Sequence, residues 1–226
     1  MSDVVEKDGE LVRDVVIAID GPAGAGKSTV GRAVAHQLGL DYLDTGAMYR
    51  GVTFGVLRRG IDPSDNEAVA RVAAAIVLVV DDNGITVDGV DADIEIRGRA
   101  VTAAVSSVAA NSAVRTELVR RQREWVTNRG GGVVEGRDIG SVVFPDAQLK
   151  LYITASARVR AERRVAEIGG DVDEVESSII ERDRKDSSRA DSPLMEASGS
   201  VVVDTSGMPI DDVVDQILQM VSDAEK

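Results

Sequence analysis

The sequence predicts an α/β fold with a five-stranded parallel β-sheet flanked by helices. The first observation is an uninterrupted aliphatic run, VVIAI at residues 15–19, which suits a strand buried on both faces because it lacks alternation. The second is a glycine-rich loop, GPAGAGKS at residues 21–28, that joins this run to a helical pattern. The third is the repeated alternation of strand-like and helix-like segments, which is typical of α/β proteins.

The composition is that of an ordinary globular protein. Of the 226 residues, 43% are hydrophobic and 29% are charged, so the chain has enough apolar side chains for a core. Asp and Glu number 39 against 26 Lys and Arg, a formal net charge of −13. This charge disfavours nucleic acid and anionic membrane surfaces as partners, and any bound anion requires a local basic site.

The residue content also excludes several kinds of site. The chain has no cysteine and a single histidine, His36, which excludes disulfides, thiolate metal sites and multi-histidine metal sites. No apolar run approaches the ~20 residues of a membrane-spanning helix. Residues 1–14 are acidic and lack the basic and apolar regions of a secretory signal. We therefore expect a flexible N-terminal tail on a cytoplasmic protein, with one folded domain at residues 15–226.

The segments after the first strand predict the remaining elements in order. A helix follows the loop, with Val30, Val34 and Leu38 on one stripe and Gly39 suited to end it. Further strands are expected at residues 41–44, 133–135, 149–153 and 201–204. Further helices are expected at residues 45–59, 101–129, 157–168, 174–186 and 210–224.

The alternation of strand-like and helix-like segments is interrupted near residues 62–64, DPS, which predicts an inserted unit. Residues 67–75 favour a helix, and two apolar segments at 76–80 and 85–88 flank the turn DDNG. Asn-Gly favours the positive φ angles of a hairpin turn, so we expect an antiparallel hairpin and a further short strand near residues 90–94.

The glycine-rich loop matches the phosphate-binding loop of nucleoside triphosphate enzymes. Its glycines let backbone N–H groups converge on phosphate oxygens, Lys27 can reach the β- and γ-phosphates, and Ser28 can coordinate Mg²⁺. A dinucleotide fingerprint does not fit, because Thr29 stands where its last glycine is required. The guanine-reading pattern of GTPase switches is absent. The predicted triphosphate-binding residues are Gly21, Pro22, Ala23, Gly24, Ala25, Gly26, Lys27, Ser28 and Thr29.

Three further motifs carry arginine beside carboxylates. They are DTGAMYR at residues 44–50, EGRDIGS at 135–141 and ERDRKDSSR at 181–189. The first two follow predicted strands, so they lie at the same sheet edge as the phosphate loop. Each arginine taken alone is equally compatible with a surface ion pair. Arg160, Arg163 and Arg164 share one helix face, which is either a solvated face or a cationic site for the charge that develops during phosphoryl transfer.

Together these motifs resemble bacterial cytidylate kinases, and the similarity runs from about residue 15 to the last helix. The resemblance implies transfer of the γ-phosphoryl group from ATP, with Mg²⁺, to CMP or dCMP by a monomeric enzyme. It implies a monophosphate-binding region and insertion at about residues 44–115 and a mobile lid at about 157–189. Glu135 and Thr45 stand where some relatives have Asp and Ser, which leaves exact contacts open.

The resemblance also implies roles for individual residues. Arg50 and Arg137 would hold the acceptor phosphate, and Ser106, Arg115 and Asp138 would read cytosine. The lid arginines Arg160, Arg163 and Arg164 would act in catalysis with Lys27. The other residues expected near CMP are Asp44, Thr45, Tyr49, Arg182, Asp186 and Arg189. Another small-molecule kinase, acting on shikimate, dephospho-coenzyme A or another monophosphate, and a nucleotide-gated switch with slow hydrolysis stay open as alternatives.

Overall fold

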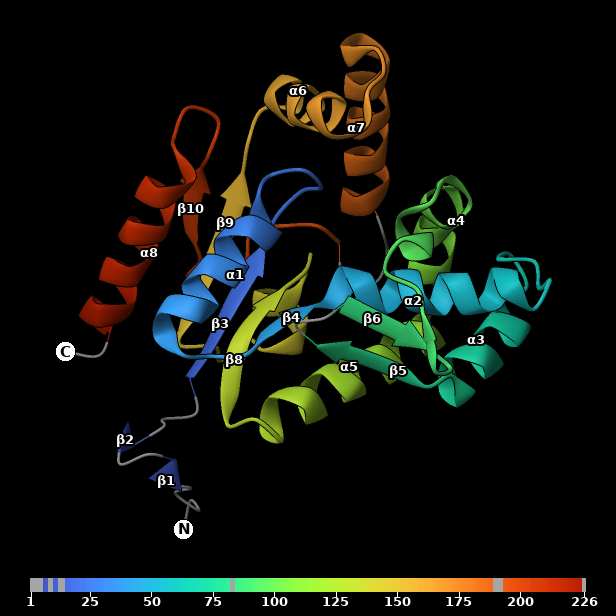
Figure 1. Cartoon of the computed structure of the whole chain (residues 1–226), viewed down its shortest axis with the longest axis horizontal. Coiled ribbons are helices and arrows are strands. Elements are labelled where there is room, and N and C mark those ends of the chain that lie inside the picture. Colours follow the sequence, from blue (N-terminus) through green and yellow to red (C-terminus); the bar gives the residue numbers. More distant parts are fainter. Residues whose placement is uncertain (1–5, 8–9, 12–14, 82–83, 189–192, 225–226) are drawn as a thin grey trace.

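A five-stranded parallel sheet forms the centre of the molecule (Figure 1), in the order β10-β9-β3-β8-β4. The structure, a computed structural model, describes residues 6–7, 10–11, 15–81, 84–188 and 193–224. The strands are β3 (Val15–Asp20), β4 (Tyr42–Asp44), β8 (Gly131–Glu135), β9 (Leu149–Thr154) and β10 (Val201–Asp204). The predicted number and direction of the strands are confirmed.

Both faces of the sheet are buried. Because successive side chains of a strand point to opposite faces, β3 contributes to a core on each face. Ile17 and Ile19 of β3 belong to a core with the apolar stripes of α1 (Lys27–Leu38) and α8 (Ile210–Ala224). Val16 and Ala18 belong to a second core, with side chains of α2 (Thr45–Arg58) and α5 (Ser112–Thr127). The unbroken aliphatic run of β3 is thus explained by two cores, one on each face.

The expected insertion lies beside the sheet and carries its own small antiparallel sheet, in the order β5-β6-β7. The predicted hairpin is confirmed, although its turn residues 82 and 83 lie outside the described residues. The third strand is shorter than expected, because the chain turns into η1 and buries Ile96. The elements are α3 (Asn66–Ala75), β5 (Leu78–Asp81), β6 (Gly84–Val87), β7 (Val90–Asp91), η1 (Glu95–Arg97) and α4 (Arg99–Ala109).

Two charged helices, α6 (Ala157–Ile168) and α7 (Val172–Ser187), pack against each other beyond the carboxyl ends of the strands (Figure 1). They occupy the segment expected to form the lid. A short π-helical segment, η2 (Ile139–Val143), follows β8 and was not predicted. It places residues 135–143 close to the end of β3.

The N-terminal segment contains two strands of two residues each, β1 (Glu6–Lys7) and β2 (Glu10–Leu11), paired antiparallel. The flexibility expected for residues 1–14 stays a prediction. Among the described residues, no helix combines the length and the apolar character that crossing a membrane requires.

Candidate active site

The phosphate loop starts at the carboxyl end of the central strand β3 and leads into α1. Gly21 has φ +143°, and a Cβ there would lie 1.9 Å from the backbone oxygen of Ile153. No other residue fits this position without moving β9. Gly26 adopts the left-handed conformation directly before α1, so the free N–H groups of the helix start face the loop.

Lys27 is 8% exposed, and its ammonium donates to the backbone oxygen of Pro22 at 2.9 Å. Burial and, to a smaller extent, the nearby Arg137 guanidinium lower the pKa of Lys27 to about 8. A phosphate group at this point would favour the charged form and raise this pKa.

Ser28 and Glu135 bring two oxygen-bearing side chains together beside the loop. The Ser28 hydroxyl donates to Glu135 Oε1 at 2.9 Å. Burial raises the pKa of Glu135, and the neighbouring Asp44 carboxylate adds to this effect. Hydroxyl and carboxylate oxygens are the hard ligands that Mg²⁺ prefers, so this pair fits a magnesium ion shared with bound phosphates. In the described part of the chain, no group of three or more Asp, Glu or His side chains forms a metal site by itself.

Arg137, from the motif EGRDIGS at residues 135–141, contacts the phosphate loop. Its Nη1 donates to the backbone oxygen of Gly21 at 2.8 Å, and its Nη2 lies 3.1 Å from Asp186 of α7. The arginine predicted to hold the acceptor phosphate therefore lies directly beside the loop predicted to hold the donor phosphates.

Arg115 and Asp138 form a buried ion pair. The Arg115 guanidinium also lies over the ring of Tyr49, 5.8 Å from its centroid. These three residues come from α5, from the start of η2 and from α2, so only the folded chain brings them together. Ser106 is half-buried on α4.

Arg50 donates to the backbone oxygen of Ile96 and to the Thr102 hydroxyl, both at 3.1 Å. Burial lowers the pKa of Arg50. The guanidinium groups of Arg97, Arg164 and Arg137 lower it further, although Asp44 acts in the opposite direction. Cationic side chains from the insertion, from α6 and from the loop after β8 thus converge, as an anion site requires in a chain of net charge −13.

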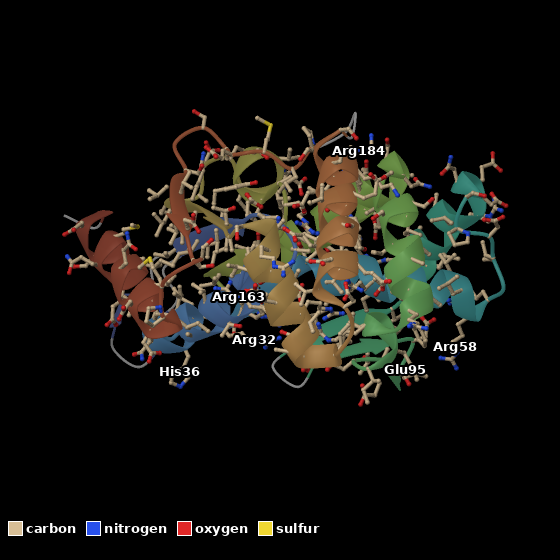
Figure 2. The ribbon with its side chains drawn as sticks, turned by 90° about the horizontal axis from the view of Figure 1, so that it is seen from above. Arg32, His36, Arg58, Glu95, Arg163 and Arg184 are labelled. Carbon is tan, nitrogen blue, oxygen red and sulfur yellow. The ribbon has the colours of Figure 1, made fainter. Side chains whose placement is uncertain are left out.

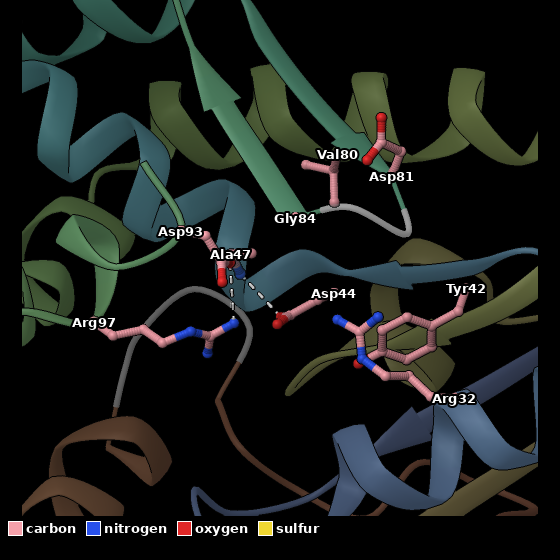
Figure 3. A pocket seen from close by; sticks show the side chains of 9 residues that line it. All are labelled: Arg32, Tyr42, Asp44, Ala47, Val80, Asp81, Gly84, Asp93 and Arg97. Carbon is pink, nitrogen blue, oxygen red and sulfur yellow. Dashed lines mark hydrogen bonds and ion pairs between the residues drawn. The ribbon is translucent and has the colours of Figure 1, made fainter. Parts of the chain in front are cut away.

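The remaining residues of the DTGAMYR motif have structural contacts. The Asp44 carboxylate caps α2 by accepting the N–H of Ala47 at 2.9 Å, and the Thr45 hydroxyl donates to the backbone oxygen of Glu135 at 2.7 Å. Figure 3 shows Asp44 at a small cavity between the core and the insertion, with the Arg97 side chain entering from η1 and Arg32 lying on the ring of Tyr42.

The three arginines predicted to share a helix face contact different partners. Arg160 is buried and donates to the backbone oxygens of Ala155 and Ala23 and to Asp183. Arg163 donates to the hydroxyl and the backbone oxygen of Thr205. Arg164 pairs with Glu167.

Three residues of the motif at 181–189 were predicted to lie near CMP: Arg182, Asp186 and Arg189. Arg182 lies 3.9 Å from Asp186, whose carboxylate is buried. Arg189 lies outside the described residues. His36 is exposed and lies in the last turn of α1, away from the loop (Figure 2).

Two residues at the site, Asp20 and Thr205, were not predicted. Asp20, the last residue of β3, accepts the N–H groups of Ile139 and Gly140, both at 2.7 Å. Burial raises the pKa of Asp20 to about 6. Its place between a buried strand and the loop was a usable signal, since polar residues at carboxyl strand ends face the ligand crevice. The Thr205 hydroxyl, which donates to the backbone oxygen of Ala25, gives no comparable signal.

The whole chain was compared with known proteins. The cytidylate kinase family model matches residues 17–223. A cytidylate kinase from Mycolicibacterium paratuberculosis is 51% identical over 217 residues, which cover 92% of this chain and 95% of that protein. A cytidylate kinase from Rhodococcus opacus is 49% identical over 218 residues, with 92% and 95% coverage. The structure of a gluconokinase from Sinorhizobium meliloti covers 94% of this chain with a TM-score of 0.51 and 18% identity, a likeness of fold alone.

The family model spans residues 17–223, a range that contains the phosphate loop and the three arginine-bearing motifs, and the relatives cover 92% of the chain. The chain belongs to the cytidylate kinase family of phosphate-loop nucleoside monophosphate kinases.

Proposed function

We propose that the protein transfers the γ-phosphoryl group of ATP to CMP or dCMP, giving ADP and the corresponding diphosphate. The observation that supports this most directly is the contact of Arg137 with the backbone of Gly21 at 2.8 Å. A phosphate held by Arg137 would lie next to phosphates held by the loop. The two reacting groups would then be positioned for direct transfer without an intermediate on the protein.

On the donor side, the loop N–H groups and Lys27 hold the ATP phosphates, and Lys27 stabilises the charge that develops on the transferring group. Ser28 would hold Mg²⁺ together with the phosphates, with Glu135 beside it. Bound Mg²⁺ supplies additional neutralisation of phosphate charge. The lid that excludes water when it closes contains Arg160, Arg163 and Arg164.

On the acceptor side, Arg50 and Arg137 hold the phosphate of CMP. The Asp138 carboxylate accepts the exocyclic amino group of cytosine, while Arg115 and Ser106 donate to the ring nitrogen and the carbonyl. Arg182 and Asp186 contact the sugar. Asp44, Thr45, Tyr49 and Arg189 complete the surroundings. Because CMP needs both an anion site and a base-reading site, this arrangement favours a nucleotide over a small polyol as acceptor.

Initial rates of ADP release with a panel of acceptors test the proposal. The panel contains CMP, dCMP, UMP, AMP, shikimate, dephospho-coenzyme A and a control without acceptor. We expect CMP and dCMP to give the highest kcat/KM and the control to give almost no ADP. ADP release that is independent of any acceptor would indicate a slow switch instead, and a higher rate with shikimate would indicate another small-molecule kinase. Light scattering of the same preparation tests the expected monomer.

A further inference from the structure

Two backbone oxygens of the phosphate loop accept hydrogen bonds from arginine side chains outside the loop. The carbonyl of Gly21 accepts from Arg137 at 2.8 Å, and the carbonyl of Ala23 accepts from Arg160 at 3.1 Å. For loop N–H groups to point at phosphate, the carbonyl groups of the same peptides must point away and find donors elsewhere. The two arginines therefore help to hold the loop in its phosphate-binding shape.

Helix α7 anchors both of these arginines. Asp183 accepts Arg160 Nη2 at 2.7 Å, and Asp186 lies 3.1 Å from Arg137 Nη2. The two aspartates are three residues apart and so lie on the same face of the helix. Each guanidinium has one nitrogen on the loop and another on α7, which gives two parallel bridges from the lid segment to the loop.

The bridge through Arg160 depends on Asp183 for its charge balance. The Arg160 side chain is 6% exposed and the Asp183 side chain is 24% exposed. The other two partners of Arg160, the backbone oxygens of Ala155 and Ala23, are neutral. A buried guanidinium without a carboxylate would be costly, so loss of Asp183 would weaken the hold of Arg160 on the loop.

We propose that Asp183 is a positioning residue that acts through Arg160 to keep the phosphate loop ready for ATP. This role rests on the proposed function only in that the loop binds ATP; it does not depend on which acceptor is used. Asp183 Oδ2 accepts Arg160 Nη2, so Asp183 acts on the loop through that guanidinium.

The test compares Asp183→Asn with Asp173→Asn. Asp173 lies on the same helix and pairs with Arg158 at an exposed position, 82% exposed, away from the loop. Calorimetry measures the Kd of ATP without any acceptor and, separately, the Kd of CMP, and thermal unfolding measures Tm. We expect Asp183→Asn to raise the Kd of ATP about tenfold, as for loss of one hydrogen bond to a charged group, and to change the Kd of CMP less than twofold. Asp173→Asn should change neither.

An unchanged Kd of ATP in Asp183→Asn would overturn the proposal. Equal weakening of ATP and CMP binding with a lowered Tm would also overturn it, because that pattern indicates a general loss of lid stability. Asp183→Glu, which keeps the charge, should recover part of the ATP affinity. Since ATP binding is measured without acceptor, failure of CMP as a substrate would be recorded separately by the acceptor panel.

Discussion

Under the proposed function, base selectivity depends on Asp138. Its carboxylate can accept the amino group of cytosine, whereas uracil presents a carbonyl oxygen that it would repel. We expect Asp138→Ala to lower kcat/KM for CMP about ten- to a hundredfold, because a polar group left unpaired in a site costs about 1–3 kcal/mol. The rate with UMP should change much less. Initial rates with both acceptors check this, and a retained cytosine preference in the variant would contradict it.

Lys27 links ATP binding to pH. Its pKa of about 8 in the ligand-free protein should rise when phosphate charge lies beside the ammonium. ATP binding near pH 8 should therefore take up protons, and ATP affinity should fall as the pH rises above 8. Calorimetry in two buffers with different ionisation enthalpies measures this uptake. Lys27→Met should abolish it; the same uptake in that variant would assign the proton to another group.

Asp20 links stability to pH. Its pKa is about 6 in the folded protein against 3.8 as an ordinary side chain, so between these values the folded state binds more protons than the unfolded chain. Its contribution to stability therefore increases as the pH falls from about 6 towards 4. Relative to Asp20→Asn, the wild type should gain about 2–3 kcal/mol over this window. Urea unfolding of both proteins at several pH values measures the difference, and parallel pH profiles would refute the assignment.

At the scale of elements, Arg121 joins α5 to the helix α3 of the insertion. It is 19% exposed and donates to the backbone oxygens of Ile76 and Ala73 at the end of α3, at 2.8 and 2.9 Å. These carbonyls have no partner within the helix, so the guanidinium serves as a cap. The helix end and α5 are thereby held together.

We expect Arg121→Ala to lower the free energy of unfolding by about 1–3 kcal/mol, because buried carbonyls lose a charged donor. Arg120→Ala is the matched control. Arg120 is the preceding residue, is 53% exposed and only pairs with Glu117 and Glu124, so its loss should cost less than about 1 kcal/mol. Equal losses in the two variants, measured by urea unfolding, would show that the cap contributes nothing.

At the scale of the whole molecule, α6 and α7 lie beyond the end of the sheet that carries the phosphate loop, and the insertion lies beside the sheet (Figure 1). A transfer reaction needs water excluded from the site, which closure of such segments achieves. We expect hydrogen exchange across α6 and α7 to slow most when ATP and CMP are both present. Mass spectrometry of exchange with each nucleotide alone and with both measures this, and identical exchange under all conditions would leave α6 and α7 as a static helical pair.

The sequence alone predicted the strands of the parallel sheet and most of the helices, although the helix expected at residues 101–129 is divided into α4 and α5 and η2 was missed. It also supplied the candidate site residues. The aliphatic run before GPAGAGKS, the helical stripe of α1 and the DDNG turn each depend on neighbours along the chain, so their patterns predict local structure directly. Residues 21–29 and the arginine-bearing motifs were found for the same reason, since their chemistry is readable from short segments.

Only the tertiary structure decided which arginines contact which partners. Arg160, Arg163 and Arg164 look equivalent on a helix face, yet the fold buries the first against Asp183 and Ala23 and leaves the last beside Glu167. The strand order that brings Asp20 against η2 is equally invisible in the sequence. Long-range pairing depends on packing and on the burial of charge, which arise only when segments distant along the chain meet.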